Sequence, residues 1–299
     1  MSATPSRQLT DILSFVPPDF ADPEADYLAV RTMLGPFHGH PVPEHITVTS
    51  TDLGGVTAAW YDDTRQPRAD RVAFHCHGGG FVSCPLDTYH FYGAMLVEQL
   101  GLRVVMPDYR LAPEHPFPAA LSDCFNAYGA LIESGVDPER LVVMGDSCGG
   151  ALALSTLVSA RDEGLPMPAC FVSVSGWFDL SVAEPGDGAP DPFLNAEWVR
   201  NRGRNYTAGT LPLNDPQVSP AFADLKGLPL LYLPVAQHDT VAAGVLALAH
   251  AAERAGVPYI IESWPGMVHG WQGLVSAGVP EAASAWVRTA EVINAAMGG

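Results

Sequence analysis

A serine between two glycines is the first group in this sequence that could do chemistry. Gly145-Asp146-Ser147-Cys148-Gly149 is the only Gly-x-Ser-x-Gly pentapeptide of the chain. The apolar run Leu141–Met144 precedes it, and the helix-like stretch Ala151–Arg161 follows it. A strand, a tight turn and a helix in that order expose a serine hydroxyl for attack on an acyl group. We therefore predict that Ser147 is a nucleophile rather than the N-cap of an ordinary turn.

A serine hydroxyl is a weak nucleophile unless a neighbouring base accepts its proton. In one common arrangement the acid and then the histidine follow the serine, on loops after later strands. Asp239 comes after the apolar run Leu230–Val235, and His269 comes after the run Tyr259–Trp264. We predict Asp239 as the acid and His269 as the base. The other candidates lie next to the acid, in a helix, in a strand or in a long insertion: His238, His250, Glu262 and Asp224.

A glycine-rich segment, His77-Gly78-Gly79-Gly80-Phe81, follows the apolar run Val72–Cys76. Consecutive glycines leave the backbone free to turn its N–H groups toward a developing oxyanion. The amide of Cys148, directly after the serine, is a further donor. Each such donor lowers the barrier by roughly 3 kcal/mol. We predict an oxyanion hole here rather than a merely flexible turn.

The elements that must position these groups alternate from residue 71 onward. Short apolar runs, typical of strands covered on both faces, are separated by longer helix-like stretches. This alternation predicts an α/β fold with a mostly parallel, doubly wound sheet and helices on both faces. The runs are Val72–Cys76, Arg103–Met106, Leu141–Met144, Cys170–Val174, Leu230–Val235 and Tyr259–Trp264, and the stretches lie near 88–100, 118–134, 149–163, 240–256 and 281–297.

Two segments lie outside this alternation, residues 1–44 and an insertion at about 176–226. Open α/β sheets bind ligands at the carboxyl ends of their strands, and long loops in a compact domain are usually functional. We therefore predict that both segments form a cap over a catalytic domain that spans 45–299. The expected local elements are helices at Thr10–Phe15, Pro23–Leu34 and Ala196–Tyr206, and a hairpin of His45–Thr49 with Val56–Tyr61.

The charge balance excludes several partners. The chain has 33 acidic and 15 basic residues, a net charge of −18. Nucleic acids and anionic lipids need clustered Lys and Arg, so neither a nucleic acid nor a membrane is an expected partner. No stretch reaches the roughly 20 apolar residues of a membrane span, and the start lacks a signal-peptide pattern. The five cysteines without a Cys-x-x-Cys pair indicate free thiols in the cytoplasm.

No cofactor and no metal are expected. His75-Cys76-His77 places two histidines on one face of a strand, but the chain lacks the further ligands that would complete a zinc site. A dinucleotide site needs Gly-x-Gly-x-x-Gly after the first parallel strand, and that pattern is absent. A phosphate loop needs a lysine after its glycines, and the only lysine is Lys226.

With a third motif, Asp108–Ala120 (DYRLAPEHPFPAA), beside the glycine loop and the serine pentapeptide, the chain resembles the hormone-sensitive-lipase-like family of bacterial esterases, bacterial family IV. The resemblance covers the chain from about residue 45. It implies a carboxylesterase with an eight-stranded α/β-hydrolase sheet under a helical cap, without a cofactor. It assigns the oxyanion hole to Gly79, Gly80 and Cys148, and makes the third motif a structural brace under the active site.

Two positions depart from the family pattern. The family usually has alanine where this chain has Cys148. The acid motif is normally Asp-Pro-Leu followed by a second acidic residue, but here the sequence is Asp239-Thr240-Val241-Ala242-Ala243. The first acid is kept, so the triad assignment is unchanged. The second acid, which would support the first, is missing.

The substrate is less well defined than the chemistry. We predict that Phe81 and Trp177 contact a small-molecule ester, and that the apolar cap residues line a small pocket for short-to-medium acyl chains. A lactone of the monoterpene ε-lactone type is an alternative substrate, because one triad serves all acyl transfers. A further alternative, from another functional class, is a receptor of the same fold that binds a small molecule without hydrolysing it. A homodimer is compatible with the sequence. The apolar cap residues are Phe15, Phe20, Phe37, Trp177, Phe178, Phe193 and Trp198.

Overall fold

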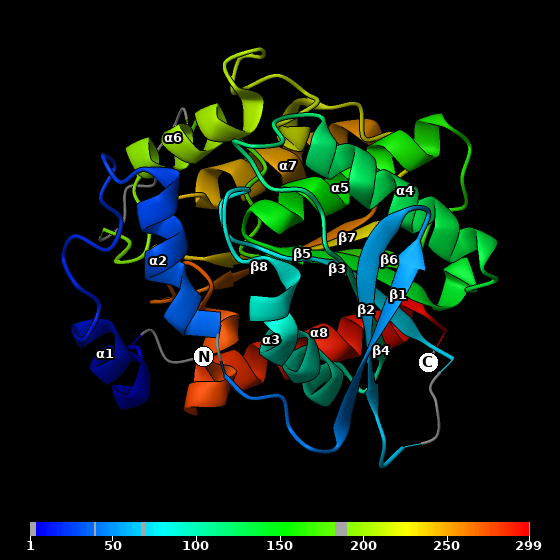
Figure 1. Ribbon diagram of the computed structural model, residues 1–299, viewed down its shortest axis with the longest axis horizontal. Coiled ribbons are helices and arrows are strands. Elements are labelled where there is room, and N and C mark those ends of the chain that lie inside the picture. Colours follow the sequence, from blue (N-terminus) through cyan, green and yellow to red (C-terminus); the bar gives the residue numbers. More distant parts are fainter. Residues whose placement is uncertain (1–3, 39, 67–69, 183–189, 299) are drawn as a thin grey trace.

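An eight-stranded sheet runs through the molecule in the order β1-β2-β4-β3-β5-β6-β7-β8 (Figure 1). The computed structural model describes residues 4–38, 40–66, 70–182 and 190–298, without the side chains of 36–38. β1 and β2 form the expected hairpin, β2 also pairs antiparallel with β4, and every later pairing is parallel. The strands are β1 (Ile46–Leu53), β2 (Val56–Asp63), β3 (Val72–Cys76), β4 (Arg103–Pro107), β5 (Leu141–Asp146), β6 (Cys170–Val174), β7 (Leu230–Ala236) and β8 (Tyr259–Trp264).

Helices cover both faces of this sheet, as the continuous apolar runs predict (Figure 1). In β3, Phe74 belongs to the core cluster that includes Leu152 of α5, whereas Ala73 belongs to the cluster that includes Leu96 of α3. Side chains that alternate along one strand are thus buried on opposite faces. One face carries α4 (Ala119–Glu133), α5 (Cys148–Asp162) and α7 (Ala242–Ala255), and the other carries α3 (Leu86–Leu100) and α8 (Pro280–Ala296).

The observed boundaries of one strand and two helices differ from those that the sequence predicts. β5 continues two residues beyond Met144, because Gly145 and Asp146 still pair with Ser173 and Val174 of β6. The first helix, α1 (Arg7–Ser14), begins earlier than expected because the Ser6 hydroxyl accepts the Leu9 amide. The second, α2 (Tyr27–His38), begins later, where the Asp26 carboxylate accepts the Ala29 amide.

The N-terminal segment lies against the long insertion between β6 and β7, where the upper end of α2 approaches α6 (Ala196–Thr207) in Figure 1. Three side chains of the insertion donate to N-terminal carbonyls: Asn195 to Ala21 at 2.6 Å, and Asn201 to Pro23 and Arg202 to Ala25 at 2.8 Å. Residues 183–189 of the predicted insertion lie outside the described residues. Short 3₁₀ helices complete the chain: η1 (Pro138–Arg140), η2 (Pro220–Phe222) and η3 (Trp271–Ala277).

Within the described residues, no helix is both long enough and apolar enough to cross a membrane.

The segment after β4 braces the glycine-rich loop. The Tyr109 hydroxyl donates to the His77 carbonyl at 2.7 Å, and the Ala112 amide donates to the Phe81 carbonyl at 2.9 Å. Arg110 is itself held by a bidentate ion pair with Asp123 of α4. Two contacts of this segment therefore fix both ends of the loop that the sequence predicts to bind an oxyanion.

A test of this close packing uses Gly149, the second residue of α5. A Cβ atom at Gly149 would lie 2.1 Å from the Cys76 carbonyl oxygen and 2.4 Å from that of His77. Gly149→Ala should therefore destabilise the fold by about 2–3 kcal/mol, the cost of overpacking. In Gly129→Ala, the matched control in α4, the new atom lies 3.8 Å from Leu165, so stability should hold or rise. Thermal unfolding compares the two, and an equal melting temperature would contradict the packing.

Candidate active site

Ser147 occupies a sharp turn between β5 and α5. Its backbone has φ 53° and ψ −127°, a left-handed conformation that a side chain rarely adopts. The turn is held from both sides, because the Ser147 amide donates to the Val174 carbonyl and the Trp177 amide donates to the Ser147 carbonyl, at 2.9 and 3.0 Å. Gly145 makes the turn feasible, since a Cβ there would meet the Gly149 carbonyl oxygen at 2.2 Å. This strained turn presents the hydroxyl above the end of the strand.

His269 and Asp239 meet this serine as the sequence predicts. The Nε2 atom of His269 lies 3.0 Å from the Ser147 Oγ atom, and its Nδ1 atom lies 3.0 and 3.1 Å from the two Asp239 carboxylate oxygens. Three groups from three loops, 30 and 122 residues apart, thus form one hydrogen-bonded chain. This geometry allows the imidazole to remove the serine proton while the carboxylate orients the ring.

Contacts between loops hold the imidazole in place. The Gly270 amide donates to the Ser175 hydroxyl at 3.0 Å, and the His238 amide donates to the Met267 carbonyl at 2.8 Å. The Asp239 carboxylate also accepts the Val241 amide at 3.0 Å. The loops after β6, β7 and β8 therefore support one another around the predicted base.

Electrostatics favour a protonated imidazole in this setting. Burial lowers the pKa of His269, but the charge and hydrogen bond of Asp239 raise it, as do the charges of Asp191 and Asp146. The net effect is a pKa above the ordinary histidine value. A carboxylate environment of this kind stabilises the imidazolium that forms when the serine is deprotonated.

The glycine-rich loop curls around the serine turn. Gly79 and Gly80 have φ values of 110° and 63°, which favour glycine. Both glycines line the cavity, and within the described residues their amides donate to no protein acceptor. The amide of Phe81 is occupied instead, because it donates to the Cys148 Sγ atom at 3.1 Å. The free amides fit a negatively charged oxygen of a bound substrate.

A buried polar network under the serine connects these two loops. The Asp146 carboxylate accepts the Gly78 amide at 2.9 Å and the Tyr89 hydroxyl at 2.6 Å, and it pairs with His75 Nε2 at 2.9 Å. Burial raises the pKa of Asp146, but the hydrogen bond and charge of His75, the hydrogen bond of Tyr89 and the charge of His77 together outweigh it, and the net pKa is lowered. No local pattern in the sequence marks this network, because His75 stands out there only as a candidate metal ligand.

The cavity beside Ser147 has a volume of about 660 Å³ and a largely apolar wall. Trp177 lines it as predicted, together with three of the other expected cap residues: Phe20, Phe193 and Trp198. A second part of the wall was not expected from the sequence, because it comes from α3 and η3: Tyr89, Phe91, Tyr92, Met95 and Leu274. The volume is in the range of small-molecule sites.

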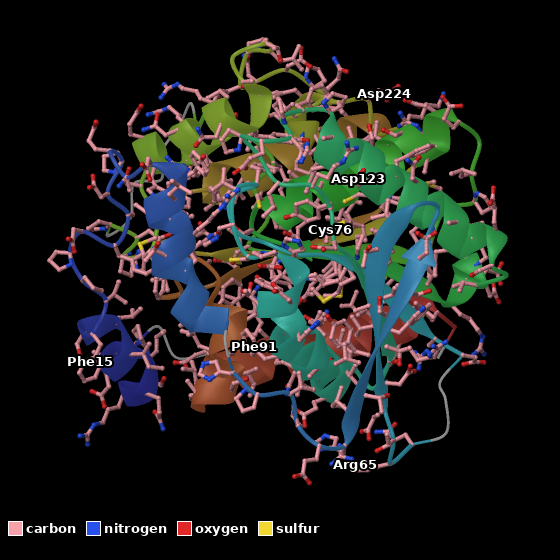
Figure 2. The ribbon with its side chains drawn as sticks, in the orientation of Figure 1. Phe15, Arg65, Cys76, Phe91, Asp123 and Asp224 are labelled. Carbon is pink, nitrogen blue, oxygen red and sulfur yellow. The ribbon has the colours of Figure 1, made fainter. Side chains whose placement is uncertain are left out.

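Several expected wall residues lie elsewhere. Phe81 is not part of the cavity wall, because its ring is buried in the core and stacks on Tyr206 at a centroid separation of 4.1 Å. Phe178 is fully buried in the core. Phe15 is 83% exposed and projects from the end of α1 (Figure 2). The side chain of Phe37 lies outside the described residues.

Asp191, which is not among the predicted site residues, lies beside the histidine and its acid. The carboxylates of Asp191 and Asp239 and a ring nitrogen of His269 lie within 4.8 Å of one another. No motif marks this aspartate, because it precedes Asp239 by 48 positions in a segment without periodicity. Only the fold brings it to the triad.

Comparison with known proteins agrees with this architecture. The sequence profile of the α/β-hydrolase fold matches residues 73–273. An acetyl-hydrolase of Streptomyces hygroscopicus is 36% identical over 222 residues, which are 73% of each chain. An esterase of the bacterial hormone-sensitive lipase family has 33% identity and a TM-score of 0.87, over 99% of this chain and 100% of its own. EstE5, solved after soaking with p-nitrophenyl butyrate, has 30% identity and a TM-score of 0.88, over 98% and 100%.

The profile match, which spans about two thirds of the sequence, and the structural match over 99% of this chain show that the chain belongs to the α/β-hydrolase family. Within that family it is a carboxylesterase of the hormone-sensitive-lipase-like group.

The raised pKa of His269 leads to a pH prediction. The base must be neutral to accept the serine proton, so kcat/KM should fall as the pH drops through the pKa of His269. Because that pKa lies above its ordinary value of 6.5, the midpoint of the acid limb should also lie above 6.5. Hydrolysis of p-nitrophenyl butyrate, followed at a wavelength where the product absorbs independently of pH, gives the midpoint. A midpoint at or below 6.5 would contradict the electrostatic assignment.

Proposed function

We propose that the chain hydrolyses esters of short-to-medium acyl chains through an acyl-enzyme on Ser147. Ser147 attacks the ester carbonyl while His269 accepts its proton, and Asp239 orients the ring and stabilises the imidazolium. The amides of Gly79, Gly80 and Cys148 hold the oxyanion. His269 then returns the proton to the leaving alcohol. A water molecule, deprotonated by the same histidine, hydrolyses the acyl-enzyme.

The observation that carries this proposal is the hydrogen-bonded chain from Ser147 through His269 to Asp239, with distances of 3.0 Å on both sides of the ring. A receptor that only binds its ligand has no need of a complete, aligned proton path. Free amides next to the same serine support turnover as well. Catalysis is therefore favoured over the binding-only alternative.

The cavity supports a small, uncharged substrate. Its wall is mainly aromatic and aliphatic, and its volume of about 660 Å³ must hold both the acyl and the alcohol parts. Trp177 contacts His269 with a ring-centroid separation of 6.1 Å, so it borders the reacting carbonyl. We place Trp177 among the substrate contacts and leave out Phe81.

We also propose the cytoplasm as the location of the protein. All five cysteines are free and buried. Free thiols at this frequency are typical of a reducing compartment.

Removal of single triad groups tests the mechanism. Ser147→Ala and His269→Ala should each lower kcat for p-nitrophenyl butyrate by about 10³-fold or more, because triad members act as a unit. Asp239→Asn should lower kcat by less, through loss of ring orientation. His250→Ala is the matched control, because His250 is exposed on α7. Full activity of the His269 variant would move the base elsewhere, and a negligible effect in Asp239→Asn would redirect the search to another acid such as Asp224.

Acyl chain length tests the cavity. Each buried methylene should contribute roughly 0.8 kcal/mol until the cavity is full. We expect kcat/KM to rise from acetate to butyrate or hexanoate and then to fall. A rate panel of p-nitrophenyl esters of graded length, run beside ε-lactones, measures this and separates esters from lactones. A preference for palmitoyl over butyryl esters would overturn the pocket assignment while leaving the triad intact.

A further inference from the structure

Asp191 joins the cap insertion to the loop of the predicted acid. One of its carboxylate oxygens accepts the Phe193 amide at 2.9 Å, and the other accepts the Thr240 amide at 3.1 Å. The hydroxyl of Thr240 donates back to the Leu194 carbonyl at 3.0 Å. Thr240 directly follows Asp239 in the chain. Two hydrogen bonds therefore fix the backbone beside the acid to the cap segment 191–194.

The same carboxylate also lies within the electrostatic range of the imidazole. Asp191, Asp239 and His269 each offer an atom within 4.8 Å of the others. Asp239 faces the Nδ1 atom directly, and its charge and that of Asp191 act on the ring together with the charge of Asp146. The imidazolium formed during attack thus has a second carboxylate beside it, on the side of the cap.

We propose that Asp191 is a positioning residue of the active site, which fixes the Asp239 loop and supplies His269 with a second carboxylate from the cap. This inference rests on the proposed triad. It makes the strength of the base depend on contact between the cap segment 191–194 and the sheet domain. A substrate that displaces this segment would weaken His269, the base that hydrolysis of the same substrate requires.

The environment of Asp191 also shifts its own pKa. Burial and the charge of Asp239 raise the pKa of Asp191 to about 7, while the charge of His269 and two backbone amides oppose the rise. The charge of each group acts on the other, so their titrations are coupled. Ionised Asp191 raises the pKa of His269, so its removal must lower that pKa.

Asp191→Asn removes the charge and keeps the size of the side chain. We expect the acid limb of kcat/KM to move to lower pH, by roughly half a unit or more, and the alkaline plateau of kcat to fall about ten-fold. KM should change by less than about two-fold, because Asp191 is not part of the cavity wall. Asp191→Glu, which restores a charge on a longer side chain, should recover most of the shift in the midpoint.

Asp179→Asn is the matched control. Asp179 accepts the amide two residues ahead, that of Ser181 at 2.8 Å, as Asp191 does with Phe193. It belongs to no cluster with the triad. We expect the pH midpoint and kcat of this variant to match those of the parent protein. Any decrease in its melting temperature measures only the stability lost with the hydrogen bonds of the turn.

A purely structural role gives a different result. If Asp191→Asn and Asp191→Glu lose activity equally, with a lower melting temperature and an unchanged pH midpoint, the proposal is overturned. NMR titration of His269 in the Ser147→Ala background adds a readout without turnover, in which Asp191→Asn should lower the imidazole pKa. An unchanged imidazole pKa there also overturns the proposal. Esterase activity that survives Ser147→Ala would instead refute the triad, so the two failures are distinguishable.

Discussion

The hydrogen bond from the Gly78 amide to the Asp146 carboxylate is the constraint on which the site depends. Asp146 directly precedes the serine, and Gly78 directly precedes the two glycines with free amides. A Cβ atom at Gly78 would lie 2.3 Å from that carboxylate, so the contact requires glycine. One buried side chain therefore sets the distance between the attacking oxygen and the amides that receive the oxyanion. Tyr89 and His75 keep this side chain charged although it is buried, because they satisfy its remaining lone pairs.

The parallel sheet supplies the rest of the alignment. The loops after β5, β7 and β8 leave the sheet at the same edge, so residues that are far apart in the sequence lie close together there. The acid and the histidine need only short loops, each fixed by a few backbone hydrogen bonds. The cap adds Asp191 from outside the sheet. In this chain Thr240-Val241-Ala242-Ala243 follows the acid without a second acidic residue, and the carboxylate of Asp191 lies within 4.8 Å of both Asp239 and His269 instead.

The sequence predicts the sheet, the serine turn and the triad because each has a local pattern. Apolar runs identify the strands, and Gly145 and Gly149 identify the turn. Contacts made across the fold have no such pattern. In the sequence, Tyr92 and Met95 have the pattern of an ordinary buried helix face, yet they line the cavity. Phe81 has the residue type of a substrate contact, yet its ring is buried against Tyr206, and no local pattern in the sequence marks that contact.

In the three hydrogen bonds between the insertion and the N-terminal segment, the two segments contribute different kinds of group. The donors are the side chains of Asn195, Asn201 and Arg202, whereas the acceptors are main-chain carbonyls that every residue possesses. At these three contacts the insertion therefore needs particular side chains, whereas Ala21, Pro23 and Ala25 contribute only their backbone carbonyls. Phe20, next to Ala21, lines the cavity, so substitutions on the N-terminal side of the pocket can alter its wall while these three hydrogen bonds are kept. Libraries that aim to alter substrate range should concentrate their variation there.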